Sequence, residues 1–332
     1  MEQVSKKRML SGIKPTGKLT LGNYIGAIKQ FITYQEEYEM FVFIADLHSL
    51  TLPIDPKELR QNTKDLIAIY LACGLDPEKV VLFKQSDVHE HAELGYIMAC
   101  NSNMGELSRM TQYKDKTAKI GNNESIPTGI YIYPTLMAAD ILLYDPDYIP
   151  VGVDQKQHVE LTRDLAIRFN SRYSDTFKIV EPVTAKTGAK INSLANPNKK
   201  MSKSESDKGT IYLLEDLAIT RKKIMSAVTD SDTSIVFDME NKPGISNLLT
   251  IMSALTNEDV NSIASRFNGQ GYGTFKKAVA DVVCEELDSL QSKVKEIQAS
   301  GIIDKVLQDG AMKASYVARK KLSKVYRKVG LR

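Results

Sequence analysis

Two short segments of this chain carry residue types that could hold a polyphosphate. Residues 200–204 (Lys-Met-Ser-Lys-Ser) place two lysines and two serines in one polar loop, and lysine acts as a mobile point charge toward phosphate oxygens. Residues 20–23 (Thr-Leu-Gly-Asn) open a helical pattern of apolar residues, and the N-terminus of a helix presents backbone N–H groups to an anion. A lone pair of lysines is usually a solvated surface feature. The combination of the two segments therefore carries the prediction of a phosphate site.

One carboxylate, Asp140, lies inside an apolar run over residues 137–143. Burying an unpaired charge is costly, so this side chain should have a partner. It is either a structural carboxylate, in a local salt bridge or at a helix end, or the acceptor for a ligand. The residues alone leave both alternatives open.

Apolar runs and helical patterns alternate around these segments. We predict buried strands over residues 9–12, 40–45 and 80–83, and helices beginning at residue 20 and over 56–72. This alternation favours an α/β fold with a doubly wound parallel sheet and right-handed crossovers. Ligands of such sheets bind beyond the carboxyl ends of the strands. Since His48 and Gln85 follow two of the predicted strands, we expect both near a ligand.

The rest of the chain is predicted to be mostly helical. Residues from about 90 to 145 interrupt the alternation and look like helices inserted between the halves of the sheet. We expect an α/β domain over residues 1–194, then the lysine loop with a helical domain over 195–290. A basic helical segment over 291–332 completes the predicted organisation.

The net charge of +3 is too small to indicate a nucleic-acid partner by itself. The final segment is strongly basic, however, and such a helix is either a solvated face or a phosphate-contacting one. Both interpretations stay open. Its cations are Lys313, Arg319, Lys320, Lys321, Lys324, Arg327, Lys328 and Arg332.

The three cysteines, Cys73, Cys100 and Cys284, are far apart and form no C-x-x-C pair. This pattern argues against a disulfide framework, a zinc finger or an iron–sulfur cluster, and it fits a reducing cytosol. We also expect no signal peptide and no membrane span, because no apolar run has the required length or position. The sequence therefore predicts a cytoplasmic protein.

Together and in this order, the two phosphate-suited segments resemble the signature segments of class I aminoacyl-tRNA synthetases. Residues 20–23 look like a degenerate form of the "HIGH" motif, and residues 200–204 are an intact "KMSKS" motif. The resemblance is closer to the bacterial tryptophanyl-tRNA synthetase family and covers nearly the whole chain. It is carried further by residues 11–17, 137–142, 151–158, 188–191 and 242–249.

The resemblance implies a Rossmann-like catalytic domain and a role for each matched residue. Asp140 would accept the indole N–H of tryptophan, an interaction that also rejects phenylalanine, since phenylalanine would leave the acceptor unpaired. Lys200 and Lys203 would hold the pyrophosphate of ATP. The other residues implied for tryptophan are Met137, His48, Gln155, Val151 and Val153. The set implied for ATP is Lys14, Pro15, Thr16, Gly22, Asn23, Gly26, Gly152, Val153, Asp154, Ile191, Lys200, Met201, Ser202, Lys203 and Ser204, and the catalytic set is Lys14, Thr20, Asn23, Lys200 and Lys203.

The reaction that the resemblance implies has two steps. Tryptophan and ATP give tryptophanyl-adenylate and pyrophosphate, and the adenylate then acylates tRNA(Trp). The attacking carboxylate is already ionised at neutral pH, so no general base is needed. No cluster of His, Asp and Glu has the spacing of a metal cage, so we expect Mg²⁺ to be held largely by the ATP phosphates. The family also implies a homodimer and an anticodon-reading helical domain.

The chain departs from the family at one position, and two other functions compete. The family usually has glutamine where this chain has Lys14, so we hypothesise an added cationic contact to the substrate carboxylate and α-phosphate. A tyrosine-specific synthetase is the nearest alternative function. A paralogue that binds tryptophan or RNA without charging tRNA is the other.

Overall fold

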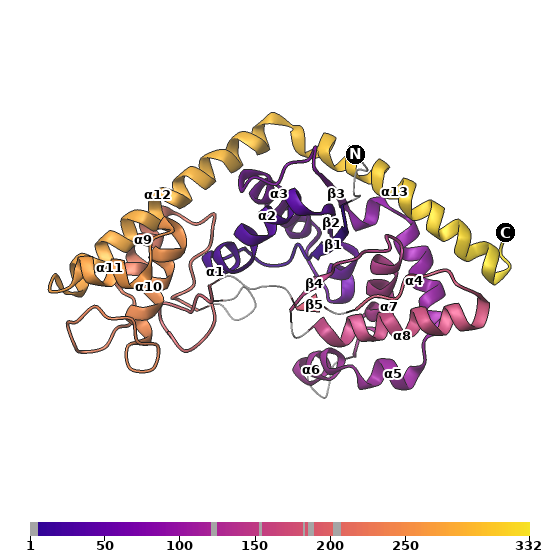
Figure 1. The fold of residues 1–332 in the computed structure, drawn as a ribbon, viewed down its shortest axis with the longest axis horizontal. Helices are drawn as coiled ribbons and strands as arrows, with labels where there is room; N and C mark the ends of the chain where they lie inside the picture. Colours follow the sequence, from indigo (N-terminus) through magenta and orange to yellow (C-terminus); the bar gives the residue numbers. More distant parts are fainter. Residues whose placement is uncertain (1–5, 121–124, 153–154, 182, 185–188, 202–206) are drawn as a thin grey trace.

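A parallel sheet forms the centre of the α/β part of the molecule (Figure 1). The computed structural model describes residues 6–120, 125–152, 155–181, 183–184, 189–201 and 207–332. Strands β1 (Arg8–Ile13), β2 (Glu39–Ile44) and β3 (Val80–Lys84) pair in parallel in the order β1-β2-β3. The two-residue strands β4 (Pro150–Val151) and β5 (Val183–Thr184) also pair in parallel. One parallel bridge between Met9 and Tyr148 places β4 beside β1.

The resulting strand order is β3-β2-β1-β4-β5, with the chain running outward from β1 in both directions. This is the doubly wound topology that the alternating pattern predicted, and its switch point lies between β1 and β4. The predicted strands at 9–12, 40–45 and 80–83 each match an observed strand to within one residue at either end.

Local capping interactions explain where two key helices begin. Thr20 and Asn23 form a reciprocal cap, in which the Asn23 N–H donates to Thr20 Oγ1 at 3.2 Å and the Thr20 N–H donates to Asn23 Oδ1 at 3.0 Å. The helix over residues 21–37 then passes through one wide π-helical stretch, η1 (Tyr24–Ile28). Asp55 caps the helix predicted at 56–72, and Pro56 takes its first position.

The helices account for most of the remaining described chain. The segment predicted as an insertion forms four helices, α4 to α7, and the part beyond residue 215 is entirely without strands among the described residues. Helix α12 continues through residue 290 to Ser300, and the predicted division of the chain into domains stays a prediction. The helices are α1 (Leu21–Asn23), α2 (Lys29–Glu37), η2 (Leu47–Thr51), α3 (Pro56–Ala72), η3 (Gln85–Asp87), α4 (Glu90–Asn101), α5 (Met104–Arg109), α6 (Thr111–Ile120), α7 (Thr128–Leu142), α8 (Lys156–Tyr173), α9 (Leu217–Met225), α10 (Pro243–Thr256), α11 (Val260–Phe267), α12 (Gly271–Ser300) and α13 (Ile302–Val329).

Alternate residues of the strands feed two separate cores on the two faces of the sheet. On β2, Met40, Val42 and Ile44 face one core, whereas Phe41 and Phe43 face the other. The first core continues without a break into the helical part formed by α9 to α12. The second lies among α4, α7, α8 and the distal half of α13. Both faces of the sheet are therefore covered, as a parallel sheet requires.

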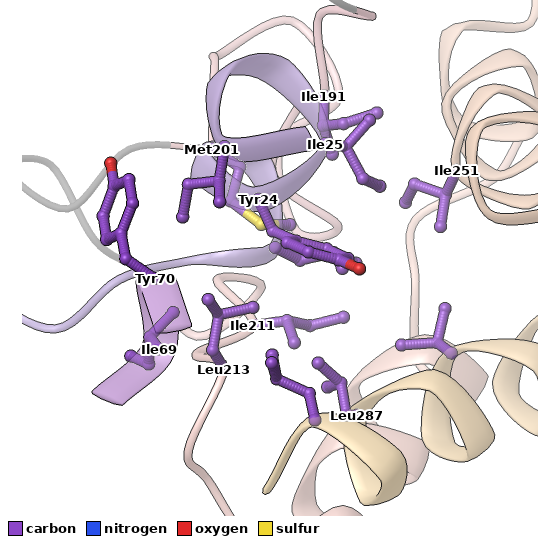
Figure 2. Close-up of a cluster of buried hydrophobic side chains, with 14 of the residues drawn as sticks. Tyr24, Ile25, Ile69, Tyr70, Ile191, Met201, Ile211, Leu213, Ile251 and Leu287 are labelled. Atoms are coloured by element: carbon purple, nitrogen blue, oxygen red, sulfur yellow. The ribbon is translucent and has the colours of Figure 1, made fainter. Parts of the chain in front are cut away.

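The two signature segments meet in the first core, at the junction of the sheet and the helical part (Figure 2). Met201 is fully buried, and its backbone N–H donates to the carbonyl of Ile191 at 2.9 Å. A Cβ added to Gly22 would lie 2.6 Å from the backbone carbonyl oxygen of Met201. Glycine is therefore required at residue 22, because real Cβ atoms do not approach a backbone oxygen so closely.

We predict that Gly22→Ala destabilises the protein and that Gly26→Ala does not. Both substitutions replace a helical glycine by alanine, and this change alone stabilises a helix by up to about 1 kcal/mol. The new methyl group at residue 22 would collide with the Met201 backbone and cost about 1–3 kcal/mol. At residue 26 the carbonyl oxygen of Ala189 would lie 3.4 Å from the added Cβ, an ordinary contact distance. Urea unfolding of both variants and the parent measures the difference, and equal stability of the two variants would contradict the packing argument.

Candidate active site

A cavity of about 200 Å³ opens at the switch point of the sheet, beside the carboxyl end of β1 and the strand β4. This is where a doubly wound sheet places its ligand. Helix α7 and the short helix η2 form one side, and α6 and α8 close over it. Its lining residues are Leu10, Ser11, Gly12, Lys14, Phe43, Ala45, His48, Thr51, Gln112, Lys116, Tyr133, Met137, Asp140, Ile141, Ile149, Pro150, Val151, Gln155 and His158.

Asp140 is the buried polar centre of this cavity. Its side chain is 1% exposed. Oδ1 accepts from Gln85 Nε2 at 2.8 Å and pairs with His91 Nδ1 at 2.6 Å, while Oδ2 pairs with His48 Nε2 at 2.8 Å. The fully buried His91 ring also contacts the Tyr144 hydroxyl through Nε2 at 2.8 Å. The carboxylate thus has the partners that its burial requires, and they come from η3, α4 and η2.

The surroundings of Asp140 keep it ionised. Burial by itself would raise its pKa, but the hydrogen bonds and charge interactions of His48 and His91 outweigh this and lower the pKa to about 2. Asp140 is therefore an acceptor without a proton of its own over the whole neutral range. An apolar wall with one fixed acceptor suits a flat apolar ligand that carries a single donor.

Four polar lining residues on α6, α7 and α8 were not expected at a ligand site: Gln112, Lys116, Tyr133 and His158. Lys116 lies over the Tyr133 ring, with its Nζ 4.1 Å from the ring centre, and burial lowers the pKa of its ammonium group. The Tyr133 hydroxyl is 2.7 Å from His158 Nε2. Gln112 lies one turn before Lys116 on α6. His158, on α8, thus contacts Tyr133 and also lines the cavity.

The described residues on either side of positions 202–206 are held by backbone and side-chain contacts. Lys200 is exposed and forms an antiparallel bridge with Asn192. Beyond the segment, Asp207 accepts from the Ser193 hydroxyl at 2.7 Å and from the Gly209 N–H at 2.8 Å. Burial would raise the pKa of Asp207, but these hydrogen bonds and that of the Thr210 hydroxyl lower it. The exposed lysine is therefore presented from a well-anchored hairpin.

The residues predicted from the sequence fall into three groups. Lys14, His48, Met137, Asp140, Val151 and Gln155 line the cavity together, as the prediction for tryptophan required of five of them. The described residues Pro15, Thr16, Thr20, Gly22, Asn23, Gly26, Gly152, Ile191, Lys200 and Met201 lie outside its lining, and Thr20, Gly22, Asn23, Ile191, Lys200 and Met201 gather at the junction of the two signature segments. Val153, Asp154, Ser202, Lys203 and Ser204 lie outside the described residues.

Lys14 is placed between two hollows. It lines the cavity with Asp140 and also a second hollow of about 300 Å³, between the 15–19 loop, α3 and residues 212–215. Within the part of the chain that the structure describes, no group of three or more His, Cys, Asp or Glu could hold a metal ion. Among the same residues, none of the helices has the length and apolarity needed to cross a bilayer.

The fold and the site define an α/β protein of the doubly wound type with a cavity at the switch point of its sheet. A family model described as "tRNA synthetases class I (W and Y)" matches residues 3–288. The chain therefore belongs to the class I tRNA synthetases of tryptophan and tyrosine.

Individual relatives agree with this assignment over their full length. The chain is 51% identical over 326 residues to a tryptophan–tRNA ligase from Caldanaerobacter subterraneus subsp. tengcongensis, with 98% of each protein covered. It is similar to a crystal structure of tryptophanyl-tRNA synthetase from Mycoplasma pneumoniae at 42% identity, with 98% of both chains covered and a TM-score of 0.85. The tryptophanyl-tRNA synthetase from Campylobacter jejuni, complexed with ADP and tryptophan, superimposes at 37% identity with a TM-score of 0.86, covering 98% of this chain and 100% of that one.

We predict that Asp140 contributes to stability in a way that disappears in acid. Its folded pKa of about 2 lies below the ordinary value, so the contribution is fully present above about pH 4 and is lost as the pH falls toward 2. The free energy of unfolding of the parent should lose about 2 kcal/mol more than that of Asp140→Asn between pH 5 and pH 2. Urea unfolding across this range measures the difference. Glu285→Gln, on the exposed side of α12, serves as the control and should follow the parent.

Proposed function

We propose that this chain is a tryptophan–tRNA ligase that activates L-tryptophan with ATP and transfers it to tRNA(Trp). The observation that carries the proposal is the ionised Asp140 carboxylate inside an otherwise largely apolar cavity at the switch point of the sheet. Full-length relatives with this name, at 51% identity, support the same reading.

The cavity with Asp140 is the proposed tryptophan site. Indole has one donor and no acceptor that competes for it, so a fixed carboxylate is its natural partner. Oδ1 already serves Gln85 and His91, whereas Oδ2 serves His48 alone. We assign the indole N–H to Oδ2. Met137 and Val151 would contact the ring, and Gln155 and His48 would lie near the polar part of the amino acid.

The junction of the two signature segments is the proposed ATP site. The helix start at Thr20 to Asn23 offers backbone N–H groups, and Gly22 allows the lysine segment to approach it closely. Lys200 and Lys203 would neutralise the β- and γ-phosphates. Gly152, Asp154 and Ile191 would surround the ribose and adenine. The Campylobacter jejuni structure, which holds ADP and tryptophan together, supports a shared nucleotide and amino-acid site in this fold.

The proposed reaction requires the protein to position the two substrates and to neutralise the phosphate charge, more than to act as an acid or a base. A carboxylate oxygen of tryptophan attacks the α-phosphorus in line, and the bond to the pyrophosphate oxygen breaks. The ribose hydroxyl at the end of the tRNA then attacks the carbonyl carbon, and AMP leaves. Lys116, which lines the cavity from α6, would add a fourth positive charge to those of Lys14, Lys200 and Lys203. Mg²⁺ would arrive with ATP and be held largely by its phosphates.

The remaining partners follow from surfaces outside the cavity. The helical part would read the anticodon. A homodimer would form through the inserted helices, whose exposed side chains include Tyr96 at 73% and Met104 at 76% exposure. Large exposed apolar side chains are typical of an interface between subunits. A cytoplasmic location stays a prediction.

Amino-acid-dependent exchange between ATP and labelled pyrophosphate tests the activation step without tRNA. We expect exchange with tryptophan, and at most background exchange with tyrosine or with no amino acid. A tyrosine-specific enzyme would exchange with tyrosine, and a non-charging paralogue with neither. Either result would overturn the proposal.

Asp140→Asn tests the role given to the carboxylate. We expect kcat/KM for tryptophan in the exchange reaction to fall about 100-fold, since a hydrogen bond to a charged acceptor is worth about 1.5–3 kcal/mol. The KM for ATP should change little. Glu285→Gln is the matched control outside the site. A normal KM for tryptophan in a folded Asp140→Asn protein would remove Asp140 from substrate recognition.

Lys14→Gln tests the departure from the family. The cation lines the cavity and should contact the substrate carboxylate and α-phosphate. We expect the variant to lower kcat/KM for tryptophan about tenfold, the loss of one charge-assisted contact, and to bind uncharged tryptophan mimics relatively better. Unchanged kinetics together with unchanged inhibition by such mimics would end this hypothesis.

A further inference from the structure

The positive charge of the protein is concentrated in its last 23 residues. From Gly310 to Arg332 the chain holds eight Lys and Arg and no Asp or Glu. The rest of the chain holds 36 Lys and Arg against 41 Asp and Glu, a formal charge of −5. A molecule that is otherwise acidic thus carries one strongly positive element, the distal part of α13, which lies along the outer edge of the catalytic part (Figure 1).

Only some of these cations serve the fold. Lys321 is mostly buried and pairs with Asp145, and Arg319 Nε lies 3.1 Å from Glu90 while the Arg319 side chain stays 75% exposed. The exposed Lys313, Lys320 and Arg327 have no ion pair with any described residue. Their charge therefore faces solvent without compensation.

The exposed positions form one continuous stripe along the helix. Lys313, Tyr316, Lys320, Ser323 and Arg327 recur every three or four residues, which places them on one face. The stripe is about 20 Å long at the rise of an α-helix. Tyr316, in its middle, is 77% exposed, the highest value among the large apolar side chains of the described chain. Hydrophobic burial alone would not select this combination.

We propose that this stripe of α13 is a docking surface for the sugar–phosphate backbone of RNA, and that the RNA is the tRNA substrate. A row of uncompensated cations over this length matches the regular charges of a nucleic-acid strand. The Tyr316 ring offers a flat contact for a ribose or an unstacked base. A lipid surface fits less well, because Ala314, Ala318, Leu322 and Val325 on the opposite face are buried in the second core and cannot insert.

This inference rests on the proposed function only for the identity of the RNA. Contacts to phosphates fix register and orientation and add affinity without reading sequence. The surface should therefore act on tRNA binding and leave the activation of tryptophan untouched.

The test compares two triple variants of the full-length protein. Lys313→Ala/Lys320→Ala/Arg327→Ala removes three charges from the stripe. Lys57→Ala/Arg60→Ala/Lys64→Ala removes three exposed charges from α3 and serves as the matched control. Binding of a tRNA(Trp) transcript is measured at salt concentrations from about 50 to 200 mM. Tryptophan-dependent pyrophosphate exchange and the midpoint of urea unfolding are measured for the same proteins.

For the stripe variant we expect about tenfold weaker tRNA binding and a salt dependence that is shallower by about 3 in log–log slope, one for each lost phosphate contact. Pyrophosphate exchange and unfolding should match the parent. The α3 variant should bind tRNA as the parent does. Equally weakened tRNA binding in both variants would show that only net charge matters and would overturn the proposal. An unchanged salt dependence of tRNA binding in the stripe variant would also refute the proposed docking surface.

Two further results distinguish this inference from the proposed function and from binding to a membrane. Absence of tryptophan-dependent exchange in the parent would overturn the proposed function, while the binding measurements would still decide the inference about RNA. Sedimentation with phosphatidylglycerol vesicles that depends on the stripe, together with unaffected tRNA binding, would assign the stripe to a membrane surface and overturn the proposal.

Discussion

The close approach of two backbone segments at Gly22 is the constraint on which the site depends. The carbonyl of Met201 occupies the space that any other side chain at residue 22 would need. Since Met201 is fully buried and hydrogen-bonded to Ile191, the lysine segment leaves the core at a defined point. The cap formed by Thr20 and Asn23 fixes the other partner. A missing side chain, a buried methionine and a capped helix start together bring two segments that are about 180 residues apart in sequence into contact.

A second constraint is the burial of Asp140 in an apolar wall. A carboxylate there would be unfavourable without compensation, and His48, His91 and Gln85 supply it from three different elements. The same contacts that make the carboxylate tolerable also fix its orientation and keep it ionised. Stability and recognition therefore use one set of hydrogen bonds. This explains the polar residues His48 in η2 and Gln85 in η3, at positions where packing alone would accept apolar ones.

The sequence predicted the sheet and the polar residues at its carboxyl edge better than it predicted the side of the cavity formed by α6 and α8. Continuous apolar runs locate β1, β2 and β3, and the rule that ligands bind at the carboxyl ends of strands singles out His48 and Gln85. Lys116 had no comparable signal, because a charged residue on an amphipathic helix looks the same whether it faces water or a cavity. His158 shows the same limit, since a histidine that contacts Tyr133 can be structural and line the cavity at once. Whether Lys116 and His158 line the cavity depends on how α6 and α8 pack against the distant α7, and the local sequence does not show this packing.

The shared core links the site to the helical part mechanically. Ile251 and Leu287 of the helical part lie in the same cluster as Tyr24, Ile25 and Met201 (Figure 2). The Tyr24 hydroxyl also donates to Glu286 on α12, so the wide π-helical stretch after the phosphate-suited helix start is tied directly to the helical part. A packed core does not deform continuously. Any movement of α12 relative to the sheet must therefore move this cluster as a unit. Such a movement would also change the contact between the Met201 carbonyl and Gly22.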